Sequence, residues 1–107
     1  MKGMPGGMAQ LMKQANQMQM RIKKLQEELS SRNFEGTSGG GAVTVTVNGE
    51  HLVTGIKISP DVLSSGDSDM LQDLVMTATN EAIKLAKSTH QKEMEKITGG
   101  MGIPGLF

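Results

Sequence analysis

Cysteine, tryptophan and tyrosine are absent from this 107-residue chain, which has only two phenylalanines. The lack of cysteine excludes disulfide frameworks, thiolate zinc sites and cysteine nucleophiles. The lack of tryptophan and tyrosine leaves almost nothing on which unpaired bases can stack, which argues against a single-stranded nucleic acid as ligand. No apolar run approaches the roughly 20 residues that span a bilayer, and no signal peptide is visible. We therefore expect a cytoplasmic protein with no membrane partner.

Catalytic and metal-binding patterns are also lacking. His51 and His90 fall in separate parts of the chain, and no serine, histidine and acid follow the spacing of a known triad motif. His90 and Glu93 share a helical face, but two ligands do not make a metal site. Residues 100–105 match a dinucleotide-binding string, yet they follow a predicted helix instead of opening one. We expect no enzyme, no metal, no cofactor and no small-molecule substrate.

Neither sign of charge is in excess, because 11 basic side chains balance 11 acidic ones. The zero total alone disfavours a nucleic-acid partner. The distribution is uneven, however: residues 1–32 have a net charge of +4, residues 33–81 of −6, and residues 82–107 of +2. The basic charge therefore lies at the two ends of the chain and the acidic charge in its middle.

A heptad pattern predicts a long first helix, from about Met8 to about Ser31. Its apolar residues alternate in spacings of three and four and form what we call the seam: Met8, Leu11, Ala15, Met18, Ile22, Leu25 and Leu29. Such a helix is roughly 36 Å long at 1.5 Å per residue. A compact chain of this size has a radius of gyration of only about 13 Å, so one copy cannot bury the helix along its length. Either the seam meets a partner or the helix projects as an arm, and in both cases we expect the chain to self-associate.

Methionine is abundant near the N-terminus, with six of the ten methionines in the first twenty residues. Thioethers are ligands for Cu(I). Methionine also fills irregular gaps between packed surfaces. We favour the second interpretation, in which these residues make the seam adaptable.

The middle of the chain changes to a period of two, which is typical of strands. Residues 43–47 alternate valine with threonine, and Asn48-Gly49 follows, the pair typical of a two-residue type I′ hairpin turn. That turn places Val45 opposite Leu52 in the next strand. One face of the hairpin then comprises Val43, Val45, Val47, Leu52, Ile56 and Ile58.

A third strand over residues 33–38 is a weaker prediction, because Gly36 is a poor residue for a strand interior. Residues 39–41, all glycine, would connect it to the hairpin, and Pro60 would end the last strand.

A second long helix is predicted to begin at Asp67-Ser68-Asp69, which supplies an N-cap and early acids, and to end at Gly99-Gly100. Its apolar face comprises Leu71, Leu74, Val75, Ala78, Ala82, Leu85 and Ala86. The expected fold is α+β: a long N-terminal helix, a small antiparallel sheet and a long C-terminal helix. Residues 1–107 would form one domain, with residues 1–7 and 99–107 as flexible tails.

The basic residues concentrate on the two predicted helices. A solvated outer face would explain this pattern, but segregation onto two helices, doubled in a dimer, favours contact with the phosphates of duplex DNA. With only two arginines in the chain, bidentate contacts to guanine would be sparse and sequence preference weak. The candidate DNA contacts are Lys13, Arg21, Lys23, Lys24 and Arg32 on the first helix and Lys84, Lys87 and Lys92 on the second.

Several runs resemble the YbaB/EbfC family of bacterial nucleoid-associated proteins: GGAVTVTVNG at 40–49, VTGIKISP at 53–60, LQDLV at 71–75 and ATNEA at 78–82. The resemblance covers nearly the whole chain. It implies a tweezer-shaped homodimer with sheets at the centre and helices projecting. It also implies binding to double-stranded DNA and an effect on nucleoid organisation and gene expression.

The expected dimer interface combines part of the seam with the first hairpin strand: Leu11, Met18, Ile22, Leu25, Leu29, Val43 and Val45. The alternative to DNA binding is a non-catalytic protein-interaction module, in which the methionine-rich seam docks a partner helix.

Overall fold

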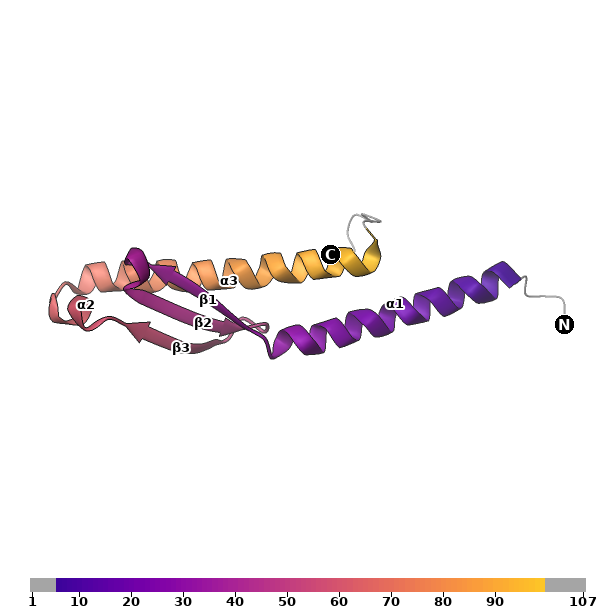
Figure 1. Cartoon of the computed structure of the whole chain (residues 1–107), viewed down its shortest axis with the longest axis horizontal. Coiled ribbons are helices and arrows are strands. Elements are labelled where there is room, and N and C mark those ends of the chain that lie inside the picture. The colour runs from indigo at the N-terminus through magenta and orange to yellow at the C-terminus, as the bar shows by residue number, and fades with distance from the viewer. Residues whose placement is uncertain (1–5, 100–107) are drawn as a thin grey trace.

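The computed structural model describes residues 6–99 and has an elongated shape (Figure 1). Its radius of gyration is 20.8 Å, against about 13 Å for a compact chain of this length. The order of elements is α1 (Gly6–Ser30), β1 (Asn33–Ser38), a 3-10 turn (Gly39–Gly41), β2 (Val43–Asn48), β3 (Val53–Ile58), α2 (Pro60–Ser64) and α3 (Ser68–Thr98). The expected α+β architecture is confirmed, and so is the weaker strand prediction for β1.

Most of both predicted tails, residues 1–5 and 100–107, lies outside the described residues. Gly6 and Gly7 belong to α1, and Gly99 is the left-handed C-cap of α3, with φ of 65°. The N-cap prediction also holds, because the Asp67 side chain accepts a hydrogen bond from the Met70 amide at 3.0 Å.

The three strands form one antiparallel sheet in the order β1-β2-β3, and α3 lies across one face of it (Figure 1). α3 packs on β1 and β2 and hardly approaches β3. A helix is about 10 Å wide and neighbouring strands are about 4.8 Å apart, so one helix covers about two strands. The core lies between α3 and these two strands: Leu29, Phe34, Val43, Val45, Val47, Ala78, Ala82 and Ala86.

Small residues allow α3 and β1 to approach closely. A Cβ at Gly36 would overlap the backbone carbonyl oxygen of Ala78 and the amide nitrogen of Ala82. Beside this contact, the Ser38 hydroxyl donates a hydrogen bond to the Leu74 carbonyl oxygen at 2.5 Å. Gly36, which weakened the strand prediction, is therefore the residue that lets the helix backbone lie against the strand.

The hairpin between β2 and β3 differs from the predicted two-residue turn. The Asn48 amide donates to the Leu52 carbonyl oxygen at 2.9 Å, and the Asn48 side chain accepts from the amide of Glu50 at 2.9 Å. The loop includes His51 in a left-handed conformation, with φ of 66°. The register prediction was wrong as a result: Val45 pairs with Ile56, not with Leu52.

The physical reason for the longer loop lies at the end of α1. A Cβ at Gly49 would overlap the carbonyl oxygen of Leu29, so the loop backbone rests directly on the last turn of the helix. This tertiary contact, together with the two hydrogen bonds that the Asn48 side chain accepts, favours a loop that local turn chemistry does not specify.

Candidate nucleic-acid interface

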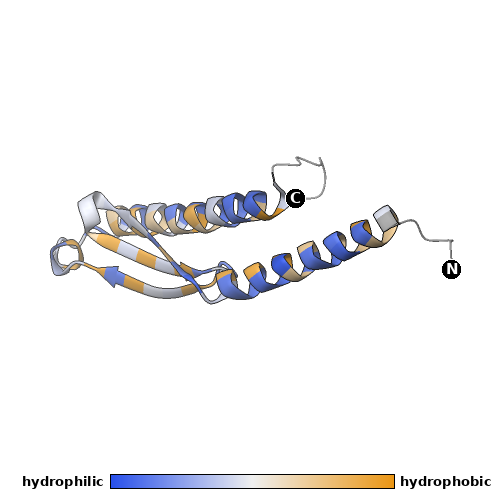
Figure 2. Ribbon diagram, turned by 45° about the vertical axis from the view of Figure 1, so that its right-hand side comes forward, coloured by the Kyte–Doolittle hydropathy of each residue, from blue (hydrophilic) through white to orange (hydrophobic). Residues whose placement is uncertain are grey.

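α1 joins the core only at its C-terminal end and then projects from the sheet. Leu29 is 5% exposed and Leu25 packs against the core, whereas Leu11 further out is 64% exposed. Figure 2 shows apolar bands recurring along α1 well beyond the sheet. The prediction that one copy cannot bury this helix is confirmed.

The cations of α1 lie mostly on the side away from the seam. Lys13 and Lys24 are eleven residues apart, about three turns, so they share one face of the helix. Lys23 lies beside Lys24, and Arg21 borders the seam. All four side chains are exposed. We call Lys13, Lys23 and Lys24 the basic face of α1.

Arg32 lies outside the helix on which it was predicted. α1 ends at Ser30, and the guanidinium of Arg32 stands 5.3 Å from the centre of the Phe34 ring, in cation–π geometry. Phe34 is itself buried in the core. Arg32 is exposed, but it stands at the junction of α1 with the sheet instead of on the projecting helix.

The lysines of α3 do not form a single stripe. Lys84, Lys87 and Lys92 are all exposed. Lys84 and Lys87 are three residues apart and neighbours on the helix surface, but Lys92 is turned about 140° from Lys87. Within residues 6–99 the one ion pair joins Lys96 Nζ to Glu93 Oε1 at 3.1 Å, so the candidate cations have no acidic partner in that range.

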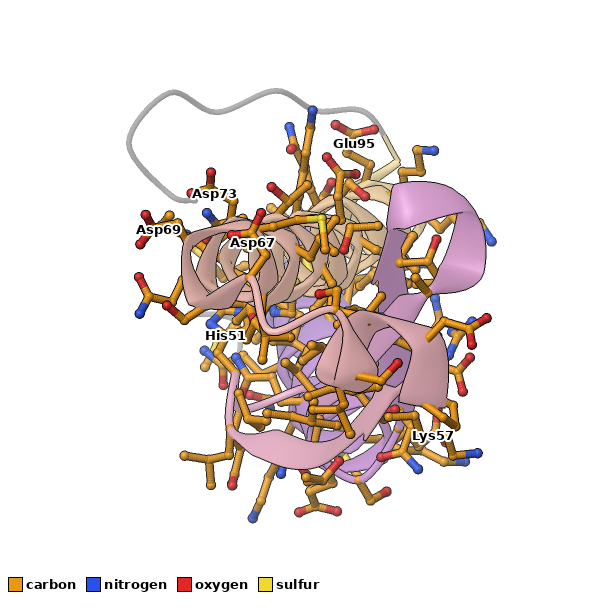
Figure 3. All side chains as sticks on the ribbon, turned by 90° about the vertical axis from the view of Figure 1, so that its left-hand side faces the viewer. His51, Lys57, Asp67, Asp69, Asp73 and Glu95 are labelled. Carbon is orange, nitrogen blue, oxygen red and sulfur yellow. The ribbon has the colours of Figure 1, made fainter. Side chains whose placement is uncertain are left out.

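Acidic side chains gather at the other end of α3. Figure 3 shows Asp67, Asp69 and Asp73 together on one side of the first turns of α3, with Lys57 on the far side of the molecule. The end that holds α2 and the start of α3 is therefore acidic, and the projecting α1 is basic. This polarity along the long axis favours the approach of a polyanion to α1 over its approach to the end that holds α2.

The expected dimer residues divide into two groups. Val43 and Val45 are 0% exposed and Leu29 is 5% exposed, because they form the core of a single chain. We therefore remove these three residues from the expected interface, since their side chains have little or no exposed surface that a second copy could contact. Leu11 is exposed, while Met18, Ile22 and Leu25 are partly exposed.

A second exposed apolar surface lies on β3. The hydrophobic alternation predicts which residues share a face of the sheet, but not which of them a helix covers. Val53 pairs with Val47 and Ile56 pairs with Val45, so both share the core-facing side of the sheet. They are nonetheless 48% and 49% exposed, since α3 does not extend over β3. We call Val53 and Ile56 the β3 face. Leu52 and Leu63, beyond the two ends of β3, are 58% and 57% exposed.

Residues 6–99 contain no group of three or more histidine or acidic side chains arranged to hold a metal ion. His51 and His90 are exposed, on the hairpin loop and on α3 respectively. In the same part of the chain, no helix combines the length and hydropathy needed to cross a bilayer.

Comparison with known proteins gives consistent matches over almost the full length. A nucleoid-associated protein of Clostridium kluyveri is 47% identical over 102 residues, covering 95% of this chain and 90% of that protein. One from Caldanaerobacter subterraneus is 49% identical over 107 residues, covering 98% and 96%. The crystal structure of an uncharacterised protein from Helicobacter pylori has the same fold, with a TM-score of 0.70, 24% identity, and coverage of 90% of this chain and 99% of that one.

The model of the YbaB/EbfC DNA-binding family matches residues 4–101, which include every element from α1 to α3. This match agrees with the exposed basic residues on the long helices. The chain belongs to the YbaB/EbfC DNA-binding family.

Proposed function

We propose that this protein binds double-stranded DNA as a homodimer, with weak sequence preference, and thereby affects nucleoid organisation and gene expression in the cytoplasm. The observation that carries the proposal is the basic face of α1, three exposed lysines on a helix that projects from the fold. Lys84, Lys87 and Lys92 on α3, with Arg21 and Arg32, would add contacts on neighbouring surfaces.

The proposed mechanism is neutralisation of phosphates. Lysine is a point charge on a flexible stem, so it pairs with phosphate without reading a base. Binding would release the counterions condensed on the duplex, which makes affinity fall steeply with salt. The absence of tryptophan and tyrosine disfavours single strands in the same site.

A salt titration tests the proposal. We expect affinity for a mixed-sequence 40-bp duplex, measured by fluorescence anisotropy, to fall by about 10³-fold or more between about 50 and 200 mM salt, as for proteins that make at least six phosphate contacts. A single strand of the same length should bind more weakly at every salt concentration. Affinity that is independent of salt, or equal for the single strand, would contradict the proposal.

The homodimer is proposed to form through the β3 face. This surface continues the core side of the sheet, and β3 is an edge strand with unpaired backbone groups along one side. A second copy placed there would bury Val53 and Ile56 and extend the core across the two-fold axis. The dimer would then double the number of basic arms.

Introducing a charge on the β3 face tests this interface. Ile56→Asp should convert the dimer to monomer at micromolar concentration in analytical ultracentrifugation, because the aspartate would be buried without a partner. The side chain is 49% exposed in one chain, so the monomer should keep its helical circular dichroism. Leu11→Glu on the seam is the matched control and should remain dimeric. Monomers from Leu11→Glu alone would instead place the interface on the seam.

Docking of a protein partner by the seam is the second candidate function. It is favoured by the exposure of Met8 and Leu11, at 51% and 64%. In that case a stoichiometric protein partner should co-purify from nuclease-treated lysate and be lost with Leu11→Glu, while affinity for duplex stays low and independent of salt.

A further inference from the structure

One methionine on α1 stands apart from the seam. Met20 is 71% exposed, the highest value among the large hydrophobic side chains of the described part of the chain. It follows Leu11 by nine residues, about two and a half turns, and so lies on the opposite side of the helix. Neither the seam nor the β3 face accounts for an apolar side chain at this position.

Two of the four nearest neighbours of Met20 on the helix surface are cations, and the other two, Asn16 and Gln17, are uncharged. Lys23 and Lys24 follow it by three and four residues, and Lys13 precedes it by seven, spacings that put all four side chains on one face. One acid, Glu27, lies on the same face, seven residues after Met20. Met20 is thus an exposed apolar side chain within the basic face of α1.

Resting on the proposed function, we infer that α1 lies in the major groove with Met20 against the C5-methyl group of thymine. An α-helix is about 10–12 Å wide and the major groove about 12 Å wide, so α1 fits the groove lengthwise. Lys23 and Lys24 lie on the two sides of Met20 around the helix, so their flexible side chains can reach phosphates on the two sides of the groove. Met20 lies between them, over the base edges.

The thymine methyl is the apolar group that the major groove presents to such a side chain. Methionine suits the contact because its unbranched thioether adapts to different positions of the methyl group. It makes no strong hydrogen bond with a base, so the contact gives a graded preference for thymine and no strict sequence. This preference is compatible with the shortage of arginine in the chain.

The test compares two duplexes that differ only in the methyl group. One 40-bp probe has thymine and the other has uracil at every such position. The full-length protein should bind the thymine probe about fourfold more tightly per methyl contacted, the effect of burying one methyl group. Met20→Ala should bind both probes with the affinity that the wild-type protein has for the uracil probe. The four affinities form a double-mutant cycle that isolates the contact between Met20 and the thymine methyl group.

Met12→Ala is the matched control, because Met12 is also exposed, at 56%, but borders the seam. Both substitutions keep a strong helix former, and circular dichroism should show unchanged helix content. Met12→Ala should retain the thymine preference.

Equal binding of the two probes by the wild-type protein would overturn the inference and leave the proposed function standing. A thymine preference that survives Met20→Ala would also overturn it. Equal binding combined with reduced DNA bending by Met20→Ala would assign Met20 as a wedge between base steps and overturn the methyl contact. Failure of the wild type to bind either duplex would reject the proposed function itself.

Discussion

Replacing Lys23 and Lys24 together by glutamate is expected to lower duplex affinity by roughly 100-fold or more at about 0.1 M salt, because each phosphate contact contributes about one decade under these conditions. A dimer loses four cations and gains four anions. Fluorescence anisotropy on the 40-bp duplex measures the effect. Both side chains are exposed, so the fold should be retained. Removing any pairing with Glu27 and Glu28 along the helix would cost only about 0.2–0.5 kcal/mol per pair.

Two further variants serve as controls: one separates the loss of positive charge from added repulsion, and the other tests where on the surface the charge matters. Lys23→Gln with Lys24→Gln removes the charges without reversing them, and should reduce the slope of log affinity against log salt by roughly 0.9 for each phosphate that is no longer neutralised. Lys57→Glu reverses the charge of an exposed lysine on β3, away from α1, and should change affinity little. Affinity that survives the double glutamate variant, or falls equally with Lys57→Glu, would contradict a binding site on α1.

The sequence predicted the long helices because their signals are local. The seam spacing and the Asp67 cap depend on residues within a few positions of each other. The strand pattern of residues 43–47 is equally local, and these residues lie in β2 as predicted. Every basic residue named as a DNA contact is exposed, as an electrostatic site requires.

What the sequence did not predict depends on contacts between distant segments. The hairpin register failed because Gly49 rests on Leu29, some twenty residues earlier in the chain. The strand pattern indicates that Val43 and Val45 are buried. It does not indicate whether the residues that pack on them belong to the same chain or to a second copy, and they were expected at a dimer interface. The exposed β3 face follows from the width of α3 relative to the sheet, which hydrophobic alternation does not encode.

Gly36→Ala is expected to lower the free energy of unfolding by about 3 kcal/mol or more, which is at the upper end of overpacking effects. The added Cβ would meet backbone atoms of Ala78 and Ala82, and a helix backbone cannot move aside as a side chain can. A domain of this size has only about 5–15 kcal/mol of stability in total. The core is formed largely by alanine and valine, so little other buried surface offsets the displacement of α3.

Gly55→Ala is the matched control for this substitution. Gly55 also lies in a strand, β3, and a Cβ there meets nothing within 4 Å. Alanine at that position should be neutral or stabilise by up to about 1 kcal/mol, since it reduces the freedom of the unfolded chain. Urea unfolding followed by circular dichroism measures both variants. Equal midpoints for Gly36→Ala and Gly55→Ala would contradict the close approach of α3 to β1. A lower midpoint for Gly36→Ala alone would support the close approach of the α3 backbone to β1, on which the placement of α3 and its lysines over the sheet depends.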